Sequence, residues 1–126
     1  TQKLKIDDRV DFLGYVSDEK LLDLYANAFC VVYTPFDEDL GYVPLESFLS
    51  KKPVITCTDS GGSLEFVEDG INGHVAEPVP ERIAEKIKLL HQDGDVKKLG
   101  INGYNKIKKM NLSWDNVIDR LLEQIG

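Results

Sequence analysis

Two glutamates, Glu38 and Glu46, stand on either side of a predicted strand-to-helix turn, with seven residues between them. The apolar run 29–33 precedes them, and the turn contains Gly41. Carboxylates accept hydrogen bonds from hydroxyls, and the free N–H groups at a helix start bind phosphate. An α/β sheet normally binds its ligand at the carboxyl ends of its strands. These groups are therefore the ones that a sugar nucleotide would need.

The environment of Glu46 can be inferred from its neighbours. It falls in an amphipathic helix beside Leu45 and Leu49, so its carboxylate cannot point far from apolar surroundings. A buried carboxylate without partners is costly, so we expect it to be hydrogen-bonded. The vicinal hydroxyls of a ribose would satisfy both oxygens. On spacing alone, a surface glutamate at the helix edge stays open as the alternative.

Three further features of the sequence have both a functional and a structural interpretation. Gly41 permits close backbone approach or a positive φ, but a simple βα turn uses glycine equally often. The acidic run 37–39 could hold a divalent metal, contact sugar hydroxyls through Glu38, or be a solvated loop. Gly61 and Gly62 precede a predicted short helix at 63–68, which gives a second helix start at the same edge of the sheet.

Composition limits the class of protein. At 126 residues the chain is one domain at most, and its formal charge of −7 argues against nucleic acid as a partner. No apolar stretch approaches the ~20 residues of a membrane-spanning helix. Cys30 and Cys57 lie in apolar runs and are expected to be buried, reduced thiols, which fits a cytoplasmic protein. A lysine-rich stretch at 97–109 indicates a solvated helix face, with peripheral contact to anionic lipid on the inner face of the membrane as the alternative.

Strands alternate with helices along the chain. Strands are expected at 10–16, 29–34, 53–57 and 74–76. Helices are expected from the N-cap Ser17, after the 35–41 loop with Pro44 in the first turn, at 63–68, and from Pro80 to the end, where Ser113 caps a last helix. This pattern predicts an α/β fold with a Rossmann-like parallel sheet and flanking helices, lacking its first βα units.

Taken together, these residues resemble the C-terminal donor-binding domain of group 1 glycosyltransferases of the GT-B fold. The resemblance covers nearly the whole chain as four blocks in the family's order: the 10–16 strand, the glutamate–seven residues–glutamate motif, the 53–55 strand with Gly61, Gly62 and Glu65, and the 69–73 turn. Residues 1–126 would then be a nucleotide-sugar-binding domain fragment.

The resemblance implies a retaining, metal-independent and cofactor-free transfer from a nucleotide-diphosphate sugar, as in polysaccharide biosynthesis. Glu38, the catalytic candidate, would contact the donor sugar, and Glu46 would bind the ribose hydroxyls. The backbone at Leu40, Gly41, Tyr42 and Val43 would lie against the sugar and the diphosphate. Gly14, Tyr15 and Val16 would lie beside the base, and Gly61 and Gly62 would shape the edge of the pocket.

Some positions depart from the family pattern. Leu40 replaces a common phenylalanine, and Lys51 replaces the usual glycine, so the helix is expected to end differently. Residues 47–49 are bulkier than usual, which implies altered packing. The family's diphosphate-binding arginine and lysine and its acceptor-binding domain would lie upstream, so the chain alone is expected to be inactive.

Two other classes of function remain as alternatives. One is a metal-dependent GT-A-type transferase that uses the acidic run 37–39. The other is a non-catalytic nucleotide- or sugar-binding α/β module. The donor sugar, the base and the acceptor do not follow from the sequence.

Overall fold

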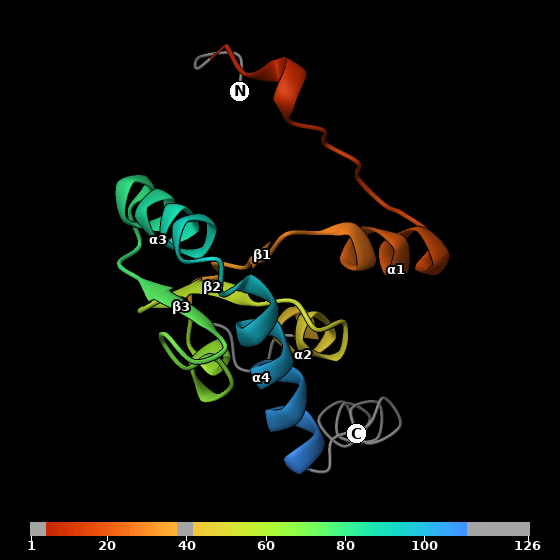
Figure 1. Cartoon of the computed structure of the whole chain (residues 1–126). Helices are drawn as coiled ribbons and strands as arrows, with labels where there is room; N and C mark the ends of the chain where they lie inside the picture. Colours follow the sequence, from red (N-terminus) through yellow and green to blue (C-terminus); the bar gives the residue numbers. More distant parts are fainter. Residues whose placement is uncertain (1–4, 38–41, 111–126) are drawn as a thin grey trace.

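A computed structural model describes residues 5–37 and 42–110 (Figure 1). In chain order the helical elements are η1 (Asp7–Arg9), α1 (Asp18–Asn27), α2 (Tyr42–Leu49), η2 (Gly62–Glu65), α3 (Pro80–Asp93) and α4 (Val96–Lys109). The strands of the described part are β1 (Val31–Val32), β2 (Val54–Cys57) and β3 (Gly73–Ala76). The predicted last helix capped by Ser113 lies outside the described residues.

The three strands form one parallel sheet in the order β1-β2-β3. Val31 pairs with Val54, and Val54 pairs in turn with Gly73. Every residue of β2 is buried, as its nearly continuous apolar sequence predicts for a central parallel strand. The α/β class and the parallel sheet with flanking helices are therefore confirmed.

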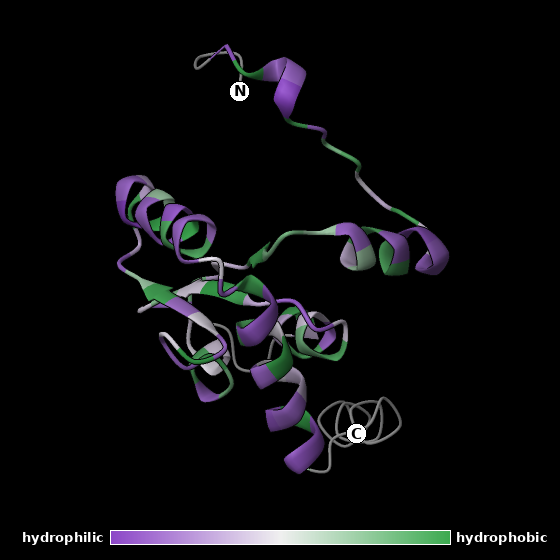
Figure 2. Ribbon diagram, viewed as in Figure 1, coloured by the Kyte–Doolittle hydropathy of each residue, from purple (hydrophilic) through white to green (hydrophobic). Residues whose placement is uncertain are grey.

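The side chains of β2 divide the core between the two faces of the sheet. Val54 packs in a cluster with residues of α2, α4 and the segment after η2: Leu45, Phe48, Phe66, Val67 and Ile107. The next residue, Ile55, points to the other face and packs with Leu90 of α3 and Leu99 of α4. Figure 2 shows that α3 and α4 each carry apolar as well as hydrophilic residues. Helices thus cover both faces, as in a doubly wound fold.

Two glycines let α4 approach α2 closely. A β-carbon added to Gly103 would overlap the ring of Phe48, and one added to Gly100 would overlap the carbonyl oxygen of Lys51. The bulk of Phe48, which is fully buried, is therefore accommodated by glycine on α4.

Lys51 stands where the family pattern has glycine, but α2 ends in the geometry typical of glycine, so the expected difference in how the helix ends is wrong. Lys51 adopts a left-handed conformation with φ of 59°. Its N–H donates to the Phe48 carbonyl at 2.9 Å, and the next N–H, of Lys52, donates to the Ser47 carbonyl at 2.8 Å. This is the Schellman arrangement, in which glycine usually takes the left-handed position. The Lys51 ammonium lies 4.9 Å from the centre of the Tyr104 ring.

The predicted strand at 10–16 is wrong. The structure assigns no strand there, and Gly14 has φ of 63°, which interrupts an extended backbone. Phe12 is 83% exposed and Tyr15 is 97% exposed. The apolar pattern predicts a buried strand, but a strand forms only where a neighbour accepts its hydrogen bonds, and the described residues provide none beside this segment. Ser17, in contrast, caps α1 as predicted by accepting from the Lys20 N–H at 3.2 Å.

Candidate functional site

The carboxyl ends of the parallel strands bring the first two predicted loops together. The loop after β1 is tied to the loop after β2 by a hydrogen bond from the Asp37 N–H to the Asp59 carbonyl, at 2.8 Å. The loop after β2 is joined to β3 by the Thr58 N–H, which donates to the Ala76 carbonyl at 2.9 Å. The turn that contains Gly61 therefore opens at the same edge as the segment leading to α2, as predicted.

Glu46 lies in the second turn of α2 and is half-buried. Its Oε2 accepts a hydrogen bond from the Tyr25 hydroxyl of α1 at 2.6 Å. The prediction that this carboxylate is hydrogen-bonded is confirmed, with a tyrosine as the partner. Among the described residues, no hydrogen bond to Oε1 is found.

The sequence alone assigns no role to Tyr25, which lies on the buried side of α1. A buried tyrosine usually finds a partner for its hydroxyl, which is the signal that could have indicated this contact. Burial raises the pKa of Tyr25 well above its usual value, and the hydrogen bond and negative charge of Glu46 raise it further. The hydroxyl therefore stays protonated and remains a donor to Glu46.

The first turn of α2 directly precedes Glu46 in the same helix. Tyr42 and Val43 form its first turn and are half-buried, and the Val43 carbonyl accepts from the Ser47 hydroxyl at 2.6 Å. Glu38, Leu40 and Gly41 lie outside the described residues. Their predicted contacts with the sugar and diphosphate therefore stay predictions.

The helix that follows the second glycine turn is shorter and more tightly wound than expected. Gly61 has φ of 74° and ψ of −121°, a conformation that glycine adopts readily and other residues rarely do. The predicted helix at 63–68 is a 3-10 turn, η2, that begins at Gly62. Since 3-10 hydrogen bonds are weaker than α-helical ones, such segments stay short.

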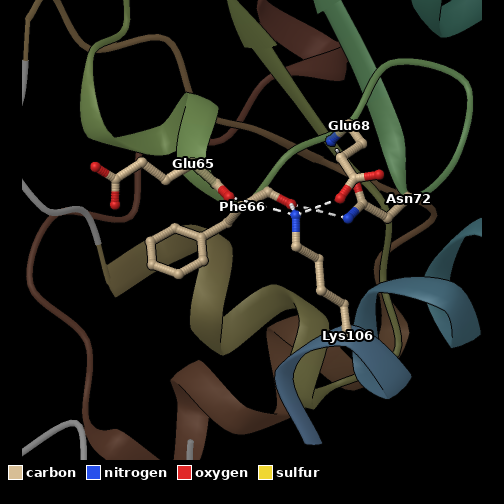
Figure 3. Close-up of polar contacts among 5 residues, drawn as sticks. All are labelled: Glu65, Phe66, Glu68, Asn72 and Lys106. Carbon is tan, nitrogen blue, oxygen red and sulfur yellow. Dashed lines mark hydrogen bonds and ion pairs between the residues drawn. The ribbon is translucent and has the colours of Figure 1, made fainter. Parts of the chain in front are cut away.

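Lys106 of α4 fixes the end of η2 (Figure 3). Its Nζ donates to the carbonyls of Glu65 and Phe66, at 3.3 and 3.1 Å, and forms an ion pair with Glu68 at 2.6 Å. The buried Asn72 side chain donates to the Phe66 carbonyl at 2.9 Å and accepts from the Glu68 N–H at 2.8 Å. The 69–73 turn thus has a structural role, because Asn72 holds the backbone of Phe66 and Glu68 directly after η2.

Gly14, Tyr15 and Val16 are not brought to this edge. They lie in the extended segment before α1, which runs away from the sheet in Figure 1. Tyr15 and Gly14 are exposed and Val16 is half-buried. Their predicted position beside the base stays a prediction that this arrangement does not support.

The described part of the chain holds two free cysteines. Cys30 and Cys57 are both free, and Cys57 is buried while Cys30 is only half-buried. Burial raises the pKa of each thiol, which disfavours the reactive thiolate. In residues 5–37 and 42–110, no three His, Cys, Asp or Glu side chains gather as metal ligands would. No helix in that part of the chain is long and apolar enough to cross a membrane.

The parallel sheet, the helices on both faces and the glycine turn beside α2 define a Rossmann-like ligand-binding domain of the kind found in the C-terminal part of GT-B glycosyltransferases. The structure superimposes on sucrose-phosphate synthase from Thermosynechococcus elongatus with a TM-score of 0.84 and 26% identity, covering 98% of this chain and 32% of that one. It also superimposes on Anabaena HepE in complex with UDP-glucose, with a TM-score of 0.75 and 29% identity, covering 86% of this chain and 30% of that one.

The family profile described as glycosyl transferases group 1 matches residues 1–106, so the chain belongs to this family. It is 36% identical over 103 residues to the alpha-1,3/1,6-mannosyltransferase ALG2 of Dictyostelium discoideum. That match covers 81% of this chain and 24% of the relative. The chain thus spans about a quarter of the length of this curated relative.

Proposed function

We propose that this chain is the donor-binding part of a retaining glycosyltransferase, which transfers a sugar from a nucleotide-diphosphate sugar to a glycan, lipid-linked or other acceptor. The observation that carries the proposal is the Glu46 carboxylate, held by Tyr25 with Oε1 unpartnered among the described residues. Support comes from the family membership and from HepE, a related structure that holds UDP-glucose.

The chemistry assigns a role to each part of the site. Glu46 would accept hydrogen bonds from the ribose hydroxyls, because an ionised carboxylate is an acceptor at both oxygens. The N–H groups at the start of α2, around Tyr42 and Val43, would face the diphosphate, since a helix N-terminus favours negative charge. The Gly61–Gly62 turn would form the pocket edge, and Glu38 would contact the donor sugar.

The resemblance to the family implies that the basic groups that neutralise the diphosphate, and also the acceptor-binding domain, would lie upstream of these 126 residues. The acidic run 37–39 repels phosphate unless such cations are present. We therefore expect the 126-residue chain to bind a nucleotide weakly and to have little or no transferase activity. Measurable sugar transfer by this chain alone would contradict that expectation.

Ligand-observed NMR with UDP, GDP and ADP, with and without manganese, tests the proposal. Glu46→Gln removes the charge of the carboxylate and keeps its shape, and Glu85→Gln on the exposed face of α3 is the matched control. We expect metal-independent binding of one nucleotide that Glu46→Gln weakens at least tenfold and Glu85→Gln leaves unchanged, since hydrogen bonds to a charged group contribute roughly 1.5–3 kcal/mol.

Two other results would contradict the proposal. Binding that requires manganese would favour the metal-dependent alternative built on residues 37–39. Silence with all three nucleotides would argue against a donor site in this chain.

A further inference from the structure

Tyr25 and Glu46 connect two helices that are far apart in sequence. Tyr25 is the buried residue of α1, with 8% of its surface exposed, and its hydroxyl reaches Glu46 of α2 at 2.6 Å. Figure 1 shows α1 otherwise standing to one side of the sheet. The contact therefore joins α1 to the element that carries the proposed ribose-binding carboxylate.

The hydrogen bond is of a strong type. A hydroxyl that donates to a carboxylate forms a charge-assisted bond, and 2.6 Å lies within the short range typical of such bonds. The hydroxyl is the donor in this pair because an ionised carboxylate can only accept. A glutamate side chain has several rotatable bonds, so this bond removes freedom that ligand binding would otherwise have to remove.

The two oxygens of the Glu46 carboxylate differ in their hydrogen bonds. Oε2 is occupied by Tyr25, whereas Oε1 has no partner in the part of the chain that the structure describes. We propose that Tyr25 is a positioning residue of the donor site, which holds Glu46 ready to accept hydrogen bonds from the ribose hydroxyls of a nucleoside diphosphate. This inference rests on the proposed function.

Tyr25→Phe tests the inference, because it keeps the buried ring and removes the hydroxyl. The measurement is the affinity for UDP and GDP and for their 2′-deoxy counterparts, by the same NMR titration on the whole chain. We expect the affinity for the ribonucleotide to fall about three- to tenfold, the range expected for one side chain that loses its preorganisation. Affinity for the 2′-deoxynucleotide should fall less, so the ratio of the affinities for the ribonucleotide and the deoxynucleotide should decrease.

Two further variants sharpen the test. In a Glu46→Gln background, Tyr25→Phe should cause no further loss of discrimination, because the two residues act through one carboxylate. Tyr104→Phe on α4 removes the hydroxyl of a half-buried tyrosine and should change neither affinity.

A purely structural role for Tyr25 gives a different result. If Tyr25→Phe lowers the melting temperature but leaves the discrimination between ribose and deoxyribose unchanged, Tyr25 only anchors α1 and the inference is wrong. If the unmodified chain binds neither UDP nor GDP, the proposed function fails first, and the inference fails with it.

Discussion

Gly100 of α4 lies against the backbone of Lys51, so close that a β-carbon on Gly100 would overlap the Lys51 carbonyl oxygen. The neighbour is main chain, which cannot move aside as the end of a flexible side chain would. Gly100 therefore allows α4 to pack on the turn that ends α2. This turn directly follows the helix that carries Glu46.

Gly100→Ala should destabilise the protein although alanine is the better helix former. The overlap is expected to cost about 1–3 kcal/mol, as overpacking does in cores, and the gain in helix propensity offsets at most about 1 kcal/mol. Chemical denaturation measures the difference in unfolding free energy. Asn105→Ala, at an exposed position of the same helix, is the control and should change stability little. A Gly100→Ala variant as stable as the unmodified chain would contradict the packing described.

Lys51→Gly should stabilise the fold. A non-glycine residue in the left-handed region costs about 1–2 kcal/mol, and glycine removes that strain at the position where helices usually use it. The loss of the contact between the Lys51 ammonium and the Tyr104 ring offsets about 0.5 kcal/mol of the gain. Thermal unfolding should thus show a net gain of about 0.5–1.5 kcal/mol.

The Tyr104 contact can be separated from the backbone effect. In a Tyr104→Leu background the ring is already absent, so Lys51→Gly should stabilise more than it does in the unmodified chain. An equal gain in both backgrounds would mean that the ring contact contributes nothing.

The sequence predicted the parts of the fold that depend on local patterns. The buried β2 and the Ser17 cap each follow from residue types at fixed spacings. The prediction of a strand at 10–16 was wrong because a strand needs a neighbouring strand, and the presence of that neighbour depends on residues distant in sequence. The Tyr25–Glu46 contact was missed for the same reason, since it joins residues 21 positions apart on two helices.

Lys106→Met should loosen η2. The methionine keeps most of the apolar stem but removes the donor to the Glu65 and Phe66 carbonyls and the ion pair with Glu68. Because these groups are partly exposed, we expect a loss of about 1–2 kcal/mol in unfolding free energy. Hydrogen exchange should quicken at the amides of Phe66 and Val67, which bond within this turn. Lys108→Met, on the exposed face of α4, should change neither quantity.

Asp69 should make stability depend on pH in the acidic range. Burial by itself raises the pKa of Asp69, but the Val75 N–H at 2.8 Å and the nearby Lys86 and His74 outweigh it and hold the pKa below its usual value. A carboxyl whose pKa is lower in the folded state stabilises that state above the unfolded pKa of ~3.9, and the stabilisation is lost as the pH falls through the folded pKa. The difference in unfolding free energy between the unmodified chain and Asp69→Asn should therefore be largest near neutral pH and shrink below about pH 4. Denaturation at a series of pH values measures this difference, and a difference that stays constant down to about pH 2.5 would show that the charge of Asp69 does not contribute.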